Sequence, residues 1–302
     1  MIVTTAALVL TLAQAPAHQP PPPQTDQTVP VQRGGRLTID NFAGEVVIHT
    51  WNNDSLHVVA RHQSRTRVNI RPTAAGVTVS ASGSMGPAGS VDYEITAPSW
   101  MPIKVDGQFN FITVDGAQAE VSADSVRGDI TIKGGTGFVT AKTIEGEIVV
   151  EGARGKVTVS SVNQGIRISD TSGDIAADTV NGAITMTGIK SSSVEASTTN
   201  GDITYDGNLA DGGRYALTTH NGDIVMGIPE TASATFTVRT YNGEFRTDLP
   251  MEGRLPPDEM HRGKRVTMTL GKGSADVTLE SFGGTLRVRK GPLPQPRGRG
   301  RE

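Results

Sequence analysis

A glycine-centred motif recurs along most of the chain and restricts the fold more than any other feature. The copies read VRGDITIKG, IEGEIVVEG, VNGAITMTG, TNGDITYDG, HNGDIVMGI and YNGEFRTDL, and most have an acidic residue after the first glycine. A degenerate copy surrounds Gly165, and successive motif glycines are 18, 19, 17, 19, 21 and 21 residues apart. A fixed period of this kind indicates a repeat architecture in which each unit stacks on the next.

Apolar and polar residues alternate after each motif glycine, as at Ile130 and Ile132 or Ile184 and Met186. Alternation with a period of two predicts a strand with one buried face. Further glycines at Gly137, Gly155 and Gly173 divide the period into halves of about nine residues. A half of that length accommodates about five strand residues and a short turn.

The same turn sequence recurs once per period, which favours stacked coils over a sandwich of hairpins with varied turns. We therefore predict an all-β fold, a parallel β-solenoid of about 19 residues per coil, with an N-terminal β cap region up to about Ile103. The Asn-Gly pairs have two explanations: a ladder of stacked amides, or turns that need a positive φ. These pairs are Asn181-Gly182, Asn200-Gly201, Asn221-Gly222 and Asn242-Gly243.

The composition agrees with many short strands and excludes several kinds of site. Glycine is frequent, at 36 of 302 residues, and aromatic residues make up only 4%. The chain has no cysteine, which excludes disulfides, thiolate metal sites and cysteine nucleophiles. Its formal net charge of −3 gives the whole chain no strong attraction to nucleic acid.

Both ends of the sequence differ from the repeat. An apolar run from Ile2 to Leu12 precedes Ala13-Gln14-Ala15, which predicts a signal peptide over residues 1–15 and a periplasmic, secreted or cell-surface protein. No basic residue precedes this run, so a frayed apolar tail or a mis-assigned start is the alternative. A Pro-rich linker is expected over residues 16–30, the repeat domain over 31–290, and a basic Pro/Gly/Arg tail over 291–302.

The Gly-Asp-Ile turns and the segment RGGRLTIDNFAGEVVIHTWNNDSLHVVARHQ resemble a bacterial family of unknown function called putative adhesins. The likeness covers most of residues 31–290. It implies export and a right-handed, β-helix-like body, and it supplies no catalytic residue. The family's adhesive role is itself inferred from its repeats.

Acidic residues after the glycines suggest calcium between coils as one alternative. The chain lacks the Gly- and Asp-dense nonapeptides of calcium solenoids, so we expect these carboxylates to cap turn amides and splay into water. The six histidines form no zinc motif. We therefore expect no metal and no cofactor. The acidic residues are Asp129, Glu147, Asp174, Asp202, Asp223 and Glu244.

Two segments depart from the repeat and are candidates for function. Arg61, Arg65, Arg67 and Arg71 lie at alternate positions, which predicts a basic stripe on one face of a strand. The stripe is either an anion-binding patch or a charged edge that prevents sheet-to-sheet aggregation. The other segment is a Pro-rich insertion over residues 249–263.

The function expected from these features is a non-catalytic binding or scaffold protein of the cell envelope. Its partners would be an anionic envelope glycan or lipid, or another envelope protein, with no nucleic acid and no membrane span. A polymer-forming solenoid scaffold is the first alternative, and a glycan-active β-helix enzyme is the second.

Overall fold

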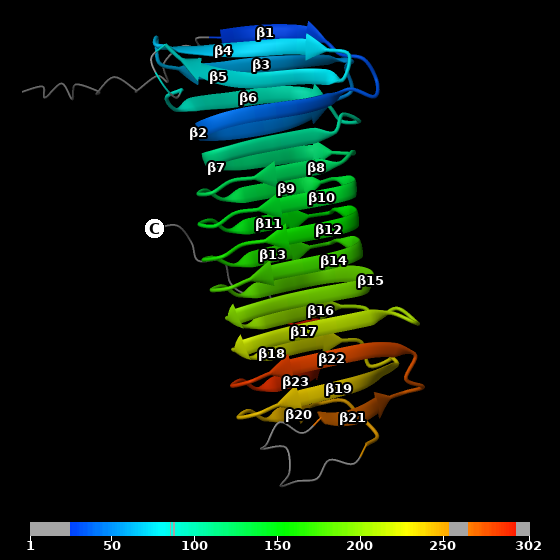
Figure 1. Ribbon diagram of the computed structural model, residues 1–302. Helices are drawn as coiled ribbons and strands as arrows, with labels where there is room; N and C mark the ends of the chain where they lie inside the picture. Colours follow the sequence, from blue (N-terminus) through cyan, green and yellow to red (C-terminus); the bar gives the residue numbers. More distant parts are fainter. Residues whose placement is uncertain (1–24, 85, 87, 254–264, 294–302) are drawn as a thin grey trace, which may run out of the picture.

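The computed structural model describes residues 25–84, 86, 88–253 and 265–293. Figure 1 shows an elongated stack of strands, which confirms the all-β prediction. No helix within these ranges has the length and hydrophobicity needed to cross a bilayer. The predicted signal peptide and most of the basic tail lie outside the described residues.

Two sheets face each other across the core. Sheet I contains, in spatial order, β4 (Thr66–Thr73), β5 (Gly76–Gly83), the first part of β2 (Arg36–Trp51), the first part of β7 (Ile103–Ala117), β8 (Val121–Asp124), β10 (Thr136–Lys142), β12 (Arg154–Ser160), β14 (Ser172–Thr179), the second part of β15 (Ile184–Asn200), β17 (Arg214–Asn221), β22 (Ala275–Ser281), β19 (Ala234–Thr240) and β21 (Arg265–Leu270).

Sheet II contains, in spatial order, β1 (Thr25–Pro30), β3 (Ser55–His62), β6 (Val91–Pro98), the second parts of β2 and β7, β9 (Ile130–Gly134), β11 (Ile148–Glu151), β13 (Ile166–Ser169), the first part of β15, β16 (Ile203–Gly207), β18 (Ile224–Ile228), β23 (Leu286–Lys290) and β20 (Phe245–Thr247). The long strands β2, β7 and β15 bend from one sheet into the other. Parallel pairing through the body confirms the solenoid arrangement.

Like residues stack in columns because each coil pairs in register with the next. Ile130 lies beside Ile148, Ile148 beside Ile166, and Ile166 beside Ile184, an offset of 18 residues at each step. The offsets become 19 at Ile203 and 21 at Ile224. All six side chains are buried, so the alternation read from the sequence identifies the inward face of sheet II.

The C-terminal coils stack in a different order from their order in the chain (Figure 1). Strand β22 pairs with β17 on one side and with β19 on the other, so the last coil lies between two earlier ones. Strand β21 runs antiparallel to β19 and ends sheet I. The predicted insertion is described only up to Gly253. Within it Leu249 is buried and Glu252 pairs with Thr269 of β21.

The N-terminal end also departs from simple coiling. Strand β2 lies between β5 and β7 in sheet I, and between β6 and β7 in sheet II. Strands β3 and β4 run antiparallel to β6 and β5, and β1 pairs antiparallel with β3. The boundary predicted for the Pro-rich linker is therefore wrong, because Thr25–Pro30 forms β1.

Candidate functional site

A column of buried hydroxyl groups lies at the turns that lead from sheet I to sheet II. Thr143 Oγ1 donates to Gly128 O at 3.2 Å, and Thr219 Oγ1 donates to Gly201 O at 2.9 Å. Each hydroxyl thus satisfies a carbonyl of the neighbouring coil. The sequence reading missed this column, although Ser or Thr stands three residues before the turn glycine in most copies. The equivalent donors include Ser161, Thr198 and Ser281.

The motif glycines allow neighbouring coils to approach closely. A Cβ atom on Gly201 would lie 2.1 Å from Gly182 O, and one on Gly222 would lie 2.0 Å from Gly201 O. None of Gly182, Gly201, Gly222 and Gly243 has a positive φ. The explanation from tight-turn geometry is therefore wrong for these four, and close backbone approach accounts for them.

An amide ladder runs along the same edge. Asn200 Nδ2 donates to Asn181 Oδ1 at 2.9 Å, and Asn221 Nδ2 donates to Asn200 Oδ1 at 2.9 Å. Asn163, which the sequence reading did not include, accepts from Asn181 at 3.3 Å. The placement of Asn242 next to Asn221 is wrong, because the coil containing β22 and β23 lies between them and puts Gly283 beside Asn221.

The turn carboxylates bond to backbone amides of the next coil. Asp129 Oδ1 accepts from Glu147 N at 2.8 Å, and Asp202 Oδ1 accepts from Asp223 N at 2.8 Å. Asp174 does not belong to this column, because it lies on β14 beside Lys156. No group of three or more His, Cys, Asp or Glu side chains among the described residues has the arrangement of a metal site.

An exposed apolar ridge runs beside the buried hydroxyls. Its residues come directly after the buried Ser and Thr residues in the sequence, as at Val126, Ile144 and Val180. Towards the C-terminal end the ridge is aromatic. The His220 and Phe282 rings stack with centroids 4.8 Å apart, and Phe282 lies 5.1 Å from the Tyr241 ring. Because these rings lie against one another on successive coils, we assign the ridge to coil stacking. The sequence reading did not identify it.

The four arginines of the predicted stripe do not share one strand. Arg61 lies on β3 and forms an ion pair with Glu94 at 3.4 Å. Arg65 lies in the turn before β4, while Arg67 and Arg71 point outwards from β4. The single stripe is therefore wrong, because the turn at residues 63–65 separates Arg61 from the others.

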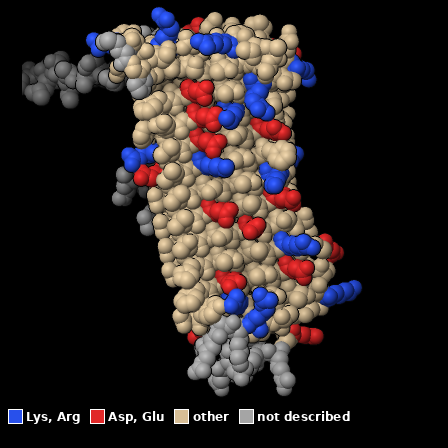
Figure 2. Space-filling view, viewed as in Figure 1, with Lys and Arg blue, Asp and Glu red and all other residues tan. Residues whose placement is uncertain are grey.

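Arg65, Arg67 and Arg71 are exposed, and their side chains have no ion-pair or hydrogen-bond partner among the described residues. Arg65 and Arg67 line an open pocket of about 440 Å³ with the hydroxyl-bearing Ser64, Ser82 and Ser84. Figure 2 shows blue Lys and Arg side chains around this end of the molecule. Guanidinium and hydroxyl donors around one pocket are suited to phosphate, sulfate or carboxylate groups.

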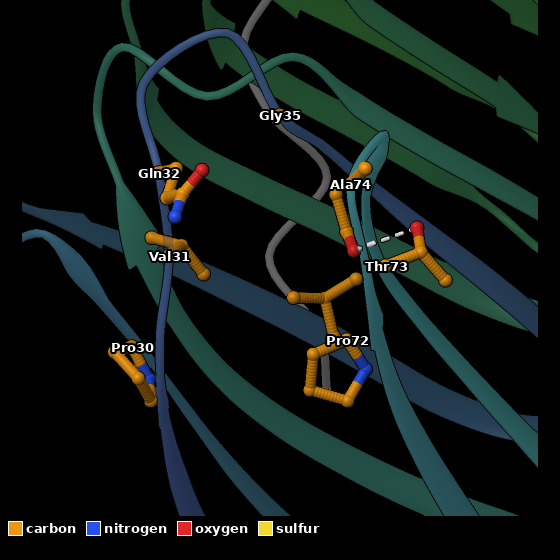
Figure 3. Close-up of a pocket in the computed structure, with 9 residues that line it drawn as sticks. Pro30, Val31, Gln32, Gly35, Pro72, Thr73 and Ala74 are labelled. Carbon is orange, nitrogen blue, oxygen red and sulfur yellow. Dashed lines mark hydrogen bonds between the residues drawn. The ribbon is translucent and has the colours of Figure 1, made fainter.

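The first pocket lies where β1 and β4 begin. A second open pocket, of about 450 Å³, lies where these two edge strands end. Figure 3 shows Pro30 and Val31 on one side of it and Pro72 and Ala74 on the other. Its lining adds Gln32 and Thr73 to these apolar side chains and contains no charged residue. Both pockets therefore lie at the N-terminal end of the solenoid.

One of three comparisons with known proteins identifies a family for the chain. No curated protein matches the chain. One solved structure is described as a putative cell adhesion protein from Clostridium sporogenes, with 9% identity, coverage of 88% of this chain and 99% of that chain, and a TM-score of 0.26, which is too low to carry an argument. The model of the family described as Toastrack DUF4097 matches residues 120–289, which is more than half of the chain. This match supports the resemblance read from the turns, and the chain belongs to the Toastrack family.

Proposed function

We propose that the protein is an exported, non-catalytic binding or scaffold protein of the cell envelope that holds anionic groups at the N-terminal end of its solenoid. The observation that carries this proposal is a pair of exposed guanidinium groups, at Arg65 and Arg67, that line one pocket and have no partner in the described ranges. Family membership supports a solenoid body for this role, and the sequence of residues 1–15 supports export.

Several observations favour a structural use of the remaining polar residues. The turn carboxylates accept backbone hydrogen bonds, and the turn hydroxyls and amides bond to the next coil. In this proposal the body, with about 19 residues per coil, is a spacer, and β1, β3 and β4 form the N-terminal cap. Binding at the cap would hold an envelope polymer at a fixed distance from the C-terminal end of the solenoid.

Polymerisation through the N-terminal edges is disfavoured by two prolines. Val31 N donates to Asp54 O, so this pair is a hydrogen-bonded pair of the β1–β3 ladder. Bonded and non-bonded pairs alternate in an antiparallel ladder, so the backbone N and C=O of Pro30 point away from β3. Pro72 lies at an equivalent outward position of β4. Proline on a free edge cannot donate to an added strand and interrupts long edge-to-edge pairing.

Binding of labelled protein to dextran sulfate and to vesicles containing phosphatidylglycerol tests the proposal and separates a polymer ligand from a lipid one. We expect salt-sensitive binding to at least one probe, since exposed charges are screened within about 8 Å at physiological salt. The double change Arg65→Gln and Arg67→Gln should weaken it about tenfold, or about 1.4 kcal/mol.

Arg61→Gln is the matched control, because Arg61 is paired with Glu94 and lies outside the pocket. Its affinity should stay within about twofold of the parent protein. Absence of binding to both probes at low salt contradicts the proposal. Equal loss in the control and the double variant contradicts the assigned site.

A further inference from the structure

The two sheets end at different heights at the N-terminal end. Beyond β2, sheet II continues through β6, β3 and β1, whereas sheet I continues only through β5 and β4. Within the described residues, no strand pairs with the outer side of β4. At this end sheet I therefore stops one strand before sheet II does, and a strand added to β4 would lie opposite β1.

Backbone groups of β4 are directed towards this free edge. Ser84 N donates to Arg65 O at 3.1 Å, which identifies these residues as a hydrogen-bonded pair of the β4–β5 ladder. Bonded pairs alternate in an antiparallel ladder, so Arg67, Asn69 and Arg71 bond to β5. The N–H and C=O groups of Val68 and Ile70 consequently point outwards, where an added strand would meet them.

The end of the core is incompletely covered at the same place. Val68 and Ile70 pack against the core but are only partly buried. Across from them, Val29 of β1 is buried, whereas Gln27, two residues earlier on the same side of β1, is exposed. An added strand with apolar residues on its inner side would cover these apolar side chains, which gives it a gain beyond backbone pairing.

Charge and the need for backbone N–H donors identify the kind of segment that fits. Arg65, Arg67 and Arg71 lie along the free edge and have no acidic partner within the part of the chain that the structure describes. The chain's own segment before Thr25 contains Pro20 to Pro23, which have no N–H to offer. An acidic segment from another protein matches the edge in both respects.

The C-terminal tail of the same chain does not fit. It carries Arg297, Arg299 and Arg301. These positive charges would be repelled by the arginines at the free edge of β4.

We infer that the free edge of β4 takes an extended acidic segment of another envelope protein as an added strand. This inference rests on the proposed binding function, and it names a protein partner for the same end of the solenoid. Acidic side chains at alternate positions would face Arg67 and Arg71 on the outer side, and apolar ones would cover Val68 and Ile70. Pro72 near the end of β4 limits the added strand to a short segment.

The probe is a fluorescein-labelled, eight-residue peptide that alternates Glu with Val, measured by anisotropy against the full chain. A matched peptide carries backbone N-methyl groups at alternate positions. These groups leave the charge of the peptide unchanged and remove the N–H donors along one of its edges. We expect the N-methyl peptide to bind at least about tenfold more weakly. Val68→Pro should weaken the parent peptide similarly, while Val68→Thr, which keeps the N–H, should stay within about twofold.

Hydrogen exchange on the unmodified protein provides a second measurement that does not depend on the variants folding. The amides of Val68 and Ile70 should exchange more slowly when the parent peptide is present. Equal binding of both peptides, or unchanged exchange at these amides, overturns the inference and leaves only an anion site. Failure of dextran sulfate and anionic vesicles as well as the peptide rejects the proposed function too.

Discussion

Thr198 Oγ1 donates a hydrogen bond of 3.0 Å to the carbonyl oxygen of Gly182 on the neighbouring coil, from a buried side chain to a half-buried turn. The bond joins two coils at a point where the backbone changes from one sheet to the other. Removing the hydroxyl leaves the Gly182 carbonyl without this partner.

Thr198→Val should therefore lower the free energy of unfolding by about 1–2 kcal/mol. The matched control is Thr204→Val, because Thr204 lies on the outer side of β16 and its hydroxyl has no hydrogen-bond partner among the described residues. Urea unfolding followed by circular dichroism measures both. Equal stability of the Thr198 variant and the parent would show that the hydroxyl column does not hold the coils together.

Gly201→Ala should be strongly destabilising, by several kcal/mol, because the new methyl group would lie 2.1 Å from Gly182 O. The three nearest atoms are all backbone atoms of the neighbouring coil, so no flexible side chain can move away. Gly89→Ala is the control, since the nearest atom to its Cβ is 3.5 Å away and its φ is not positive. Thermal unfolding distinguishes them, and comparable melting temperatures would contradict the close-approach explanation.

Tyr93→Phe should raise the free energy of unfolding by about 1 kcal/mol. The Tyr93 hydroxyl is buried without a hydrogen-bond partner, and burial raises the pKa of this phenol. Tyr215→Phe should have the opposite effect, because the Tyr215 hydroxyl donates to Ser191 O at 2.6 Å and accepts from Ala210 N at 2.8 Å. A loss of stability in both variants would mean that the Tyr93 hydroxyl has a partner in solution.

Asp178→Asn should stabilise the protein at neutral pH. Desolvation, and then the charge of Glu195, raise the pKa of Asp178 above its ordinary value. The unfolded chain therefore ionises first as the pH rises, and the stability that Asp178 contributes at low pH is lost as the pH passes its folded pKa. The gain from the variant should appear at pH 7 and disappear at a pH below the ordinary pKa of Asp.

Glu195→Gln should give part of the same gain, because it removes the second cause of the raised pKa. Urea unfolding at the two pH values measures both variants. An advantage of Asp178→Asn that is as large at acidic pH as at neutral pH would assign the effect to packing instead of charge.

The period-two pattern was sufficient to predict the inward face of the coils. Ile203 is fully buried and Thr204 beside it is not, because one side of the strand faces the other sheet. The hydroxyl column was accessible from the same repeats, since Ser or Thr precedes the turn glycine at a fixed distance. The role of each hydroxyl depends on a carbonyl of the neighbouring coil, and the sequence of a single repeat does not show which carbonyl lies beside it.

The order of the C-terminal coils could not be read from the repeats. Gly243 and Gly283 are 40 residues apart in the sequence, close to two periods. Every coil offers similar strand edges, so nothing in the spacing tells whether a later coil lies beyond an earlier one or between two others. This ambiguity led to the wrong position for Asn242.

The arginine site was predicted in part. Alternation from Arg61 to Arg71 suggested one strand, because His62-Gln63-Ser64 contains no glycine or proline to indicate a turn. The structure separates Arg61 from the rest and places Arg65 and Arg67 at one pocket. The serines of that pocket come from β5, from the residue that follows its end and from the turn before β4, so their proximity depends on the hairpin register.

Hydrogen–deuterium exchange of the full chain, with and without dextran sulfate at low salt, tests the central claim most directly. The account predicts slower exchange confined to residues 62–84, around Arg65 and Arg67, with no change in the turns that carry the Asn ladder. Protection spread along that turn edge, or found only in the C-terminal tail, would contradict binding at the N-terminal end of the solenoid.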